Sequence, residues 1–186
     1  MTSARSIPPH GANAATDWTN PMITPDYCRL MSRYNSWQNT SLVTAASTLD
    51  HEARWQDRGA FFGSIAATLN HLLWDDALWL ERFAGNARAE ETVNPTLDAP
   101  ADWDGFTTLR RQRDGEIAAW AAGLKAVDVT GEVTWYPAGG TERVVKPRQL
   151  CIMHLFNHQT HHRGQVHCML TAAGATPEAT DLPMLA

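Results

Sequence analysis

The sequence predicts an all-α protein folded as a four-helix bundle, and three observations support this prediction. Four long segments carry apolar residues at steps of three and four, which is the period of a helix that buries one face. The segments are long enough for helices of roughly 33 to 40 Å at about 1.5 Å per residue. A length of 186 residues with 44% hydrophobic content suits one domain with its own core.

The N-terminal part of the chain lacks this pattern. Residues 1–21 are rich in Ala, Ser, Thr, Pro and Gly and show no apolar period. We therefore expect a disordered arm over residues 1–21 and the bundle domain over residues 22–186. Patterned sequence begins close to Met22, which makes Met22 an alternative to Met1 as the start of translation.

The first two helices follow from the apolar pattern and from stop signals. The first is expected from Pro25 to about Thr48. Residues 49–60 are charged and contain a glycine, so we expect a connection with a short helical turn around residues 50–55. The second helix is expected over residues 61–84, a long apolar run without proline that the following glycine ends.

A long loop separates the second and third helices. Residues 86–102 contain two prolines, and they are too broken for any regular element. Because an extended chain covers up to about 3.3 to 3.6 Å per residue, this loop can travel the length of a helix and lets the helices on either side run parallel. The third helix is expected from Trp103 to about Lys125.

A small β-hairpin or extended arm is expected between the third and fourth helices. In residues 133–145, β-favouring side chains flank a turn that contains Pro137 and two glycines. The fourth helix opens after Pro147 and continues to about Ala173, where Gly174 closes it.

Charge and cysteine content exclude several classes of protein. The net charge is -5, and the fifteen Lys and Arg residues are scattered along the chain, so we expect no nucleic-acid binding. No stretch approaches the roughly 18 to 20 apolar residues that a membrane span needs, and the N-terminus lacks the pattern of a signal peptide. Cys28, Cys151 and Cys168 make an odd number, which favours a reducing compartment and predicts a cytoplasmic protein.

Histidines are concentrated in the fourth predicted helix. Five of the eight histidines lie in residues 154–167. A stripe at helical spacing on one face consists of Leu150, His154, His158, His162, Val166 and Met169. Within it, His158 and His162 form an H-x-x-x-H pair, which places two imidazoles one turn apart and near enough to bind one metal ion.

A third metal ligand is expected from the second helix, where His71 lies among leucines. Three neutral imidazoles leave a fourth coordination position for water or substrate, which is typical of a catalytic rather than a structural ion. His71 is alternatively a hydrogen-bonded core histidine, and His154 is an alternative fourth ligand. His161 lies one step off the stripe, so we expect it to be exposed or to support a ligand.

Three charged residues near these histidines are candidates for supporting roles. Ligating imidazoles usually donate their second N–H to an oxygen acceptor, and Asp75 and Asp76 are the candidate acceptors. Either carboxylate is also a candidate general base, or a plain surface charge. Arg163 is a candidate contact for an anionic group of the substrate, or it packs against neighbouring segments together with Gln165.

Two runs of sequence resemble a known family. GAFFGSIAATLNHLLWDDALWLERFAG and HLFNHQTHHRGQVHCML are similar to the DinB and YfiT-like family of proposed metalloenzymes, and YNSWQN fits its first helix. The resemblance extends from about residue 25 to the C-terminus. It implies helices in up-down-down-up order, frequent dimers, and a metal held by His71, His158 and His162. It also implies Asp76 as the more characteristic acidic residue, in N-H-L-L-x-x-D.

Two functions from different classes remain open. The first is a divalent-metal-dependent enzyme, either a hydrolase or a thiol-dependent transferase, that acts as a homodimer on a small molecule such as a low-molecular-weight thiol. Zinc is the first choice of metal and nickel the second, because imidazole suits several transition metals. The alternative is a non-catalytic metal-binding sensor of stress or a scaffold dimer. A third and plainer alternative is a helical bundle with a fortuitous histidine cluster.

Overall fold

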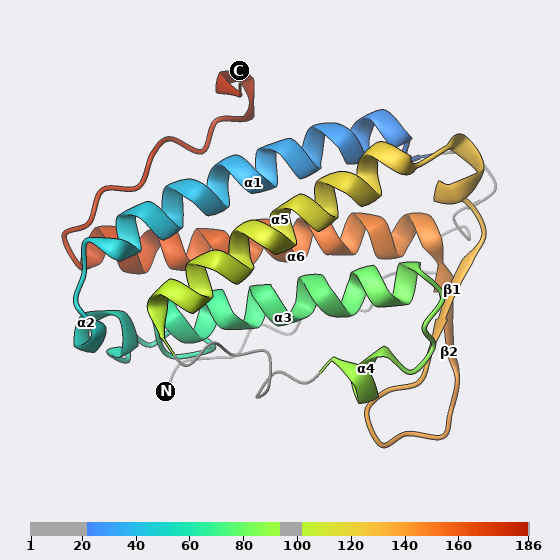
Figure 1. Ribbon diagram of the computed structural model, residues 1–186, viewed down its shortest axis with the longest axis horizontal. Coiled ribbons are helices and arrows are strands. Elements are labelled where there is room, and N and C mark those ends of the chain that lie inside the picture. The colour runs from blue at the N-terminus through green and yellow to red at the C-terminus, as the bar shows by residue number, and fades with distance from the viewer. Residues whose placement is uncertain (1–21, 94–101, 186) are drawn as a thin grey trace, which may run out of the picture.

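The computed structural model describes residues 22–93 and 102–185. Residues 1–21, which were predicted to form a disordered arm, lie outside the described residues, as do residues 94–101 and 186. The described part of the chain contains four long helices, which are α1 (Pro25–Ser47), α3 (Ile65–Phe83), α5 (Trp103–Gly123) and α6 (Arg148–Ala172) (Figure 1). The structure thus confirms an all-α bundle with a small β-hairpin.

The helices run in up-down-down-up order. Figure 1 shows α1 and α6 running in one direction and α3 and α5 in the other. Helix α1 packs beside α5 and α6, and α3 also packs beside α5 and α6. The parallel arrangement of α3 and α5 agrees with the long connection between them, which was expected to permit it.

The second long helix begins later than predicted. Its expected start was residue 61, but α3 begins at Ile65, because the Ser64 hydroxyl accepts a hydrogen bond from the backbone N–H of Ala67 at 3.1 Å and caps the helix. Gly63, just before this cap, has a positive φ of 76° that favours glycine. Phe61 and Phe62 therefore lie in a turn beside the bundle rather than in its first helical turn.

Short helices occupy the connections. Helix α2 (His51–Trp55) confirms the helical turn expected there. Helix α4 (Ala89–Thr92) corrects the prediction that residues 86–102 contain no regular element. One turn forms at α4 because Ala89 is fully buried and Glu90 pairs with Arg82 of α3. Two 3-10 turns, η1 (Ala126–Val129) and η2 (Leu182–Met184), follow α5 and α6.

The predicted hairpin is present at one end of the bundle. Strand β1 (Glu132–Trp135) pairs antiparallel with β2 (Val144–Pro147), and Val133 faces Lys146 in the register. Val133 is buried in the apolar core, and the Trp135 ring packs edge-on against Trp79 of α3 at 5.8 Å between centroids. Because β2 leads directly into α6, the hairpin fixes where α6 begins.

Within the described residues, the apolar core divides into two clusters at opposite ends of the bundle. The cluster at the hairpin end contains Ile23, Cys28, Trp79, Phe83, Ala121, Val129, Val133, Cys151, Ile152, Leu155 and Phe156. The cluster at the other end contains Leu42, Ala45, Ala46, Ile65, Leu69, Leu73, Phe106, Val166, Met169, Leu170 and Ala175. The midpoints of the four long helices lie between the clusters and carry polar side chains instead.

A central polar layer joins the four long helices at these midpoints. Arg110 of α5 pairs with Asp76 of α3 at 2.7 Å and with Asp114 at 2.9 Å. Asn39 of α1 donates to Asp114 at 2.7 Å, and Gln159 of α6 donates to Asp76. All five side chains are buried. With this layer at their midpoints, none of the helices in the described residues is long and apolar enough to cross a membrane.

Removal of the central charge should destabilise the bundle strongly. Arg110→Met leaves two carboxylates buried without their counter-ion, so we expect a loss of about 3 to 5 kcal/mol in the free energy of unfolding, measured by chemical denaturation. The control is Arg88→Met, since Arg88 forms a half-exposed ion pair with Glu91, and this change should cost less than about 1 kcal/mol. Equal stabilities for the two variants would contradict a structural role for the layer.

Candidate metal centre

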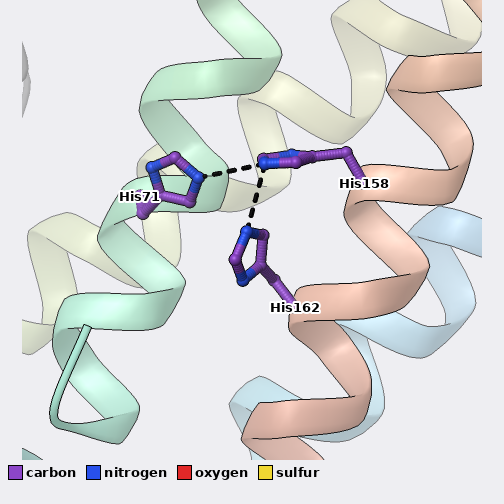
Figure 2. A group of neighbouring side chains, drawn as sticks. All are labelled: His71, His158 and His162. Atoms are coloured by element: carbon purple, nitrogen blue, oxygen red, sulfur yellow. Dashed lines mark hydrogen bonds between the residues drawn. The ribbon is translucent and has the colours of Figure 1, made fainter. Parts of the chain in front are cut away.

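Three imidazoles from two helices converge at one side of the bundle. His71 comes from α3, and His158 and His162 come from α6 (Figure 2). The Nε2 atoms of His71 and His158 are 3.3 Å apart, and those of His158 and His162 are 3.1 Å apart. The three candidate ligand atoms all lie within 4.8 Å of one another. The structure thus brings together the three histidines that the sequence singled out.

The predicted histidine stripe does not form one buried face. Leu150 is 37% exposed and His154 is exposed, whereas His158 is half-buried and His162 is only 6% exposed. The reason is that a step of four residues overshoots a helical turn by about 40°, so the stripe winds around α6. His154 consequently lies beside His158 with its ring tilted, at 5.2 Å between ring centroids, and is outside the group of three.

Two oxygen acceptors fix the orientation of the imidazoles on α6. Asp75 Oδ2 lies 3.0 Å from Nδ1 of His158, and Gln165 Oε1 lies 2.7 Å from Nδ1 of His162. Gln165 Oε1 accepts the Nδ1–H of His162, and the Asp75 carboxylate lies at ion-pair distance from Nδ1 of His158, so the Nε2 atoms of both rings face the centre of the group. In the described part of the chain, no oxygen accepts from Nδ1 of His71, whose ring stacks on Phe62 at 4.0 Å instead.

This orientation favours a cation between the rings. With both Nδ1 atoms protonated, the 3.1 Å contact between the Nε2 atoms of His158 and His162 sets two lone pairs against each other. A shared proton or a bound metal ion relieves this repulsion. Ligand nitrogens at about 2.0 to 2.1 Å from a tetrahedral zinc ion stand about 3.3 to 3.4 Å apart, close to the 3.3 and 3.1 Å of the two pairs that include His158, and all three candidate ligand atoms lie within 4.8 Å of one another. The residues present therefore fit a divalent ion.

The described residues supply three ligands to this group, which leaves further coordination positions of an ion open. Among the described residues, no fourth His, Cys, Asp or Glu joins the three histidines. His71 and His158 are partly exposed, so the group is accessible from one side. Structural zinc sites are usually closed by four protein ligands, whereas catalytic sites provide three. With three histidines, this group has the ligand composition of a catalytic site.

Burial and Asp75 set the protonation of the three rings. Burial lowers the pKa of His71 to about 4, and it also lowers the pKa of His162. Burial acts in the same direction on His158, but the hydrogen bond and the charge of Asp75 outweigh it and raise the pKa of His158. The lowered pKa values of His71 and His162 favour the neutral form that metal ligands need, and His158 is the ring that protonates first.

The two consecutive aspartates have different surroundings. Asp75 contacts His158, as expected of the acceptor behind a ligand. Asp76 contacts Arg110 and Gln159 in the central polar layer, so the structure does not place its carboxylate behind an imidazole. The pairing of Arg110 and Asp114 was missed in the sequence, although opposite charges four residues apart on the inner face of a helix were a usable signal.

Arg163 is not brought to the imidazoles. Its guanidinium donates to Thr160 Oγ1 at 3.2 Å and lies 5.5 Å from the centre of the Tyr34 ring of α1. Burial lowers the pKa of Arg163 to about 10. Phe62, by contrast, contacts His71 directly and was missed, because it lies in a turn where no helical period marks it.

Comparison with known proteins identifies a family. A family model described as the DinB family matches residues 22–186, which include all three histidines. The chain belongs to the DinB family. It is similar to Protein DinB of Bacillus subtilis (strain 168), with 26% identity over 164 residues that cover 84% of this chain and 91% of that protein. No solved structure matches the chain.

Membership of the DinB family confirms the resemblance that the two histidine-containing runs suggested. The match begins at residue 22 and extends to residue 186, the region predicted to form the bundle. This DinB-family bundle contains three histidines that could hold a metal ion.

A lower pH should weaken metal binding to this group, because a proton on His158 competes with the ion. Because the pKa of His158 is raised above the usual value of about 6.5, its proton already competes with the ion above that pH and competes more strongly as the pH falls. The lowered pKa values keep His71 and His162 neutral to lower pH, so one proton is displaced per ion. Affinity should then fall roughly tenfold per pH unit, measured by competition with a chelator. Equal affinity at about pH 7.5 and about pH 5 would contradict ligation by these histidines.

Proposed function

We propose that this DinB-family protein binds a divalent transition metal through His71, His158 and His162 and is a metal-dependent enzyme. The observation that carries the proposal is the convergence of three Nε2 atoms, two of them oriented by Asp75 and Gln165. A divalent ion at such a site lowers the pKa of a water molecule or thiol and so supplies a nucleophile near neutral pH. The open side of the group supports a catalytic role.

Zinc is the first candidate metal and nickel the second. The Nε2 spacings of 3.1 and 3.3 Å suit a small first-row ion, and three neutral imidazoles suit zinc, nickel, copper and iron. Among the described residues, the group of three contains no thiolate or carboxylate, so hard oxygen-seeking cations such as Mg²⁺ are poor candidates.

Thiol transfer is better supported than hydrolysis. Hydrolysis is helped by a general base near the attacking water. Asp75 is held at the back of His158 and Asp76 is held by Arg110, so neither candidate base faces the open side of the histidines. A thiol needs less assistance, since coordination to a metal suffices to deprotonate it. We therefore propose a thiol-dependent transferase acting on a small molecule, with a hydrolase as the other enzymatic candidate.

An aromatic rim beside His71 supports a substrate with an apolar part. Phe62 stacks on His71, and the Trp74 ring lies 6.0 Å from it between centroids. Phe61 packs edge-on against Phe62 and is itself 83% exposed. Such a rim offers dispersion contacts to a small molecule that enters beside the ion. We further propose a homodimer, which rests on the resemblance to the DinB and YfiT-like family alone.

Single substitutions should show whether the three histidines act together. His71→Ala and His158→Ala each remove one of three ligands, so we expect each variant to lose stoichiometric metal binding, measured by elemental analysis of untagged protein. His161→Ala is the matched control, because His161 is exposed on α6 next to His162 but outside the group. It should bind metal like the wild type. Full occupancy in His71→Ala would leave a fortuitous cluster as the better explanation.

The reaction class is testable with two panels of substrates. Metal-loaded protein should conjugate a low-molecular-weight thiol to small electrophiles, and His158→Ala should lose this activity because the nucleophile is no longer activated. Turnover of esters or amides without thiol would favour the hydrolase instead. Inactivity on both panels, with an oligomeric state that changes when metal is removed, would favour the non-catalytic sensor or scaffold.

A further inference from the structure

Three arginines are buried among the described residues, and they differ in their partners. Arg82 pairs with Glu90, and Arg110 pairs with Asp76 and Asp114. Arg163 is 5% exposed, yet no carboxylate of the described residues lies within 4.0 Å of it. Its hydrogen bond to Thr160 engages Nη2, and Nη1 has no hydrogen-bond partner. Among the buried arginines of the described residues, Arg163 is therefore the one without a carboxylate at ion-pair distance, and the charges of Asp76 and Asp114 act on it only from farther away.

Such a group is unfavourable unless an anion accompanies it. A guanidinium remains charged in proteins, and transfer of a charge out of water costs several kcal/mol when nothing compensates it. The Tyr34 ring, 5.5 Å from the guanidinium carbon, supplies only a weak attraction for a cation. An anionic partner from outside the chain would compensate the buried charge of Arg163.

A cavity beside Arg163 has room for such a partner. It has a volume of about 240 Å³ and lies between α1 and α6, lined by Tyr34, Gln38, Thr160, Arg163, Gly164 and His167, among others. The segment that follows α6 lies along α1 at this place (Figure 1). Thr180 and Ala179 of this segment accept hydrogen bonds from Tyr34 at 2.6 Å and from Gln38 at 2.9 Å. The cavity is therefore built from three segments.

The donors left free in this cavity suit a single negative charge. Tyr34 and Gln38 already donate to the C-terminal segment, and the Thr160 hydroxyl donates to the Phe156 carbonyl at 2.9 Å. The second amide N–H of Gln38 and the hydroxyl of Thr180 remain, but Arg163 is the one lining residue with a permanent positive charge. A phosphate group carries about -1.5 to -2 charges, which is more than the single charge of Arg163 balances. A carboxylate matches one guanidinium.

We propose that the cavity between α1 and α6 binds the carboxylate group of a small molecule, with Arg163 as its counter-ion. This site is separate from the three histidines. Arg163 follows His162 directly on α6, but its guanidinium lies against α1, whereas His162 lies against His71 of α3. Occupation of the cavity does not depend on a metal.

The probe for this site is acetate, compared with chloride at equal pH and ionic strength. Acetate should raise the Tm of the wild type in a saturable manner, by about 2 to 4 °C. Arg163→Met removes the charge at similar length and should show no such rise, whereas Arg143→Met, an exposed arginine in the hairpin connection, should respond like the wild type. His71→Ala should also respond, which separates this site from the metal centre.

A second variant keeps the proposal testable if Arg163→Met does not fold. Gly164 lines the cavity, and a Cβ at this position meets no atom within 4 Å, so Gly164→Leu should fold and place a side chain in the lining. It should reduce the acetate response. A wild-type Tm that is equal in acetate and chloride would overturn the proposal, and so would a full response in both variants. A rise with inorganic phosphate but not acetate would overturn the assignment to a carboxylate.

Discussion

The contact of Arg110 with Asp76 and Asp114 is the interaction on which the site depends. It ties α5 to α3, while Gln159 ties α6 to the same Asp76. Because Asp76 is held in the centre of the bundle, Asp75 is turned toward α6, where it meets His158. The register of α3 against α6 is thus set by the contact between Asp76 and Gln159. The same register brings His71 opposite His158.

Consecutive side chains on α3 and α6 point in different directions and therefore have different roles. Successive side chains of a helix point about 100° apart, so one residue of a consecutive pair faces the histidines and the next faces another helix. Asp75 and Asp76 follow this rule. His158 faces the imidazole group while Gln159 faces the central polar layer. The histidine group and the structural layer share two helices without sharing side chains.

Periodicity in the sequence was sufficient to predict the bundle and to single out the three histidines. The four long helices and the H-x-x-x-H pair depend on local spacing, which a sequence displays directly. The start of α3 and the turn at α4 depend instead on Ser64 and on a pair between Arg82 and Glu90. The different surroundings of Asp75 and Asp76 depend on Arg110, which is distant in sequence. Long-range partners of this kind leave no local period, so the sequence did not distinguish the two carboxylates.

The stacking of Phe62 on His71 gives the three imidazoles unequal freedom. At Nδ1, His162 is held by a hydrogen bond to Gln165 and His158 by its ion pair with Asp75, whereas the His71 ring is held by a flat aromatic contact that resists rotation weakly. His71 is therefore the donor that can swing away first, and we expect it to govern how fast an ion is exchanged. Phe62 lies in a turn outside α3. Changes in that turn can alter the residence time of an ion while all three donors are retained.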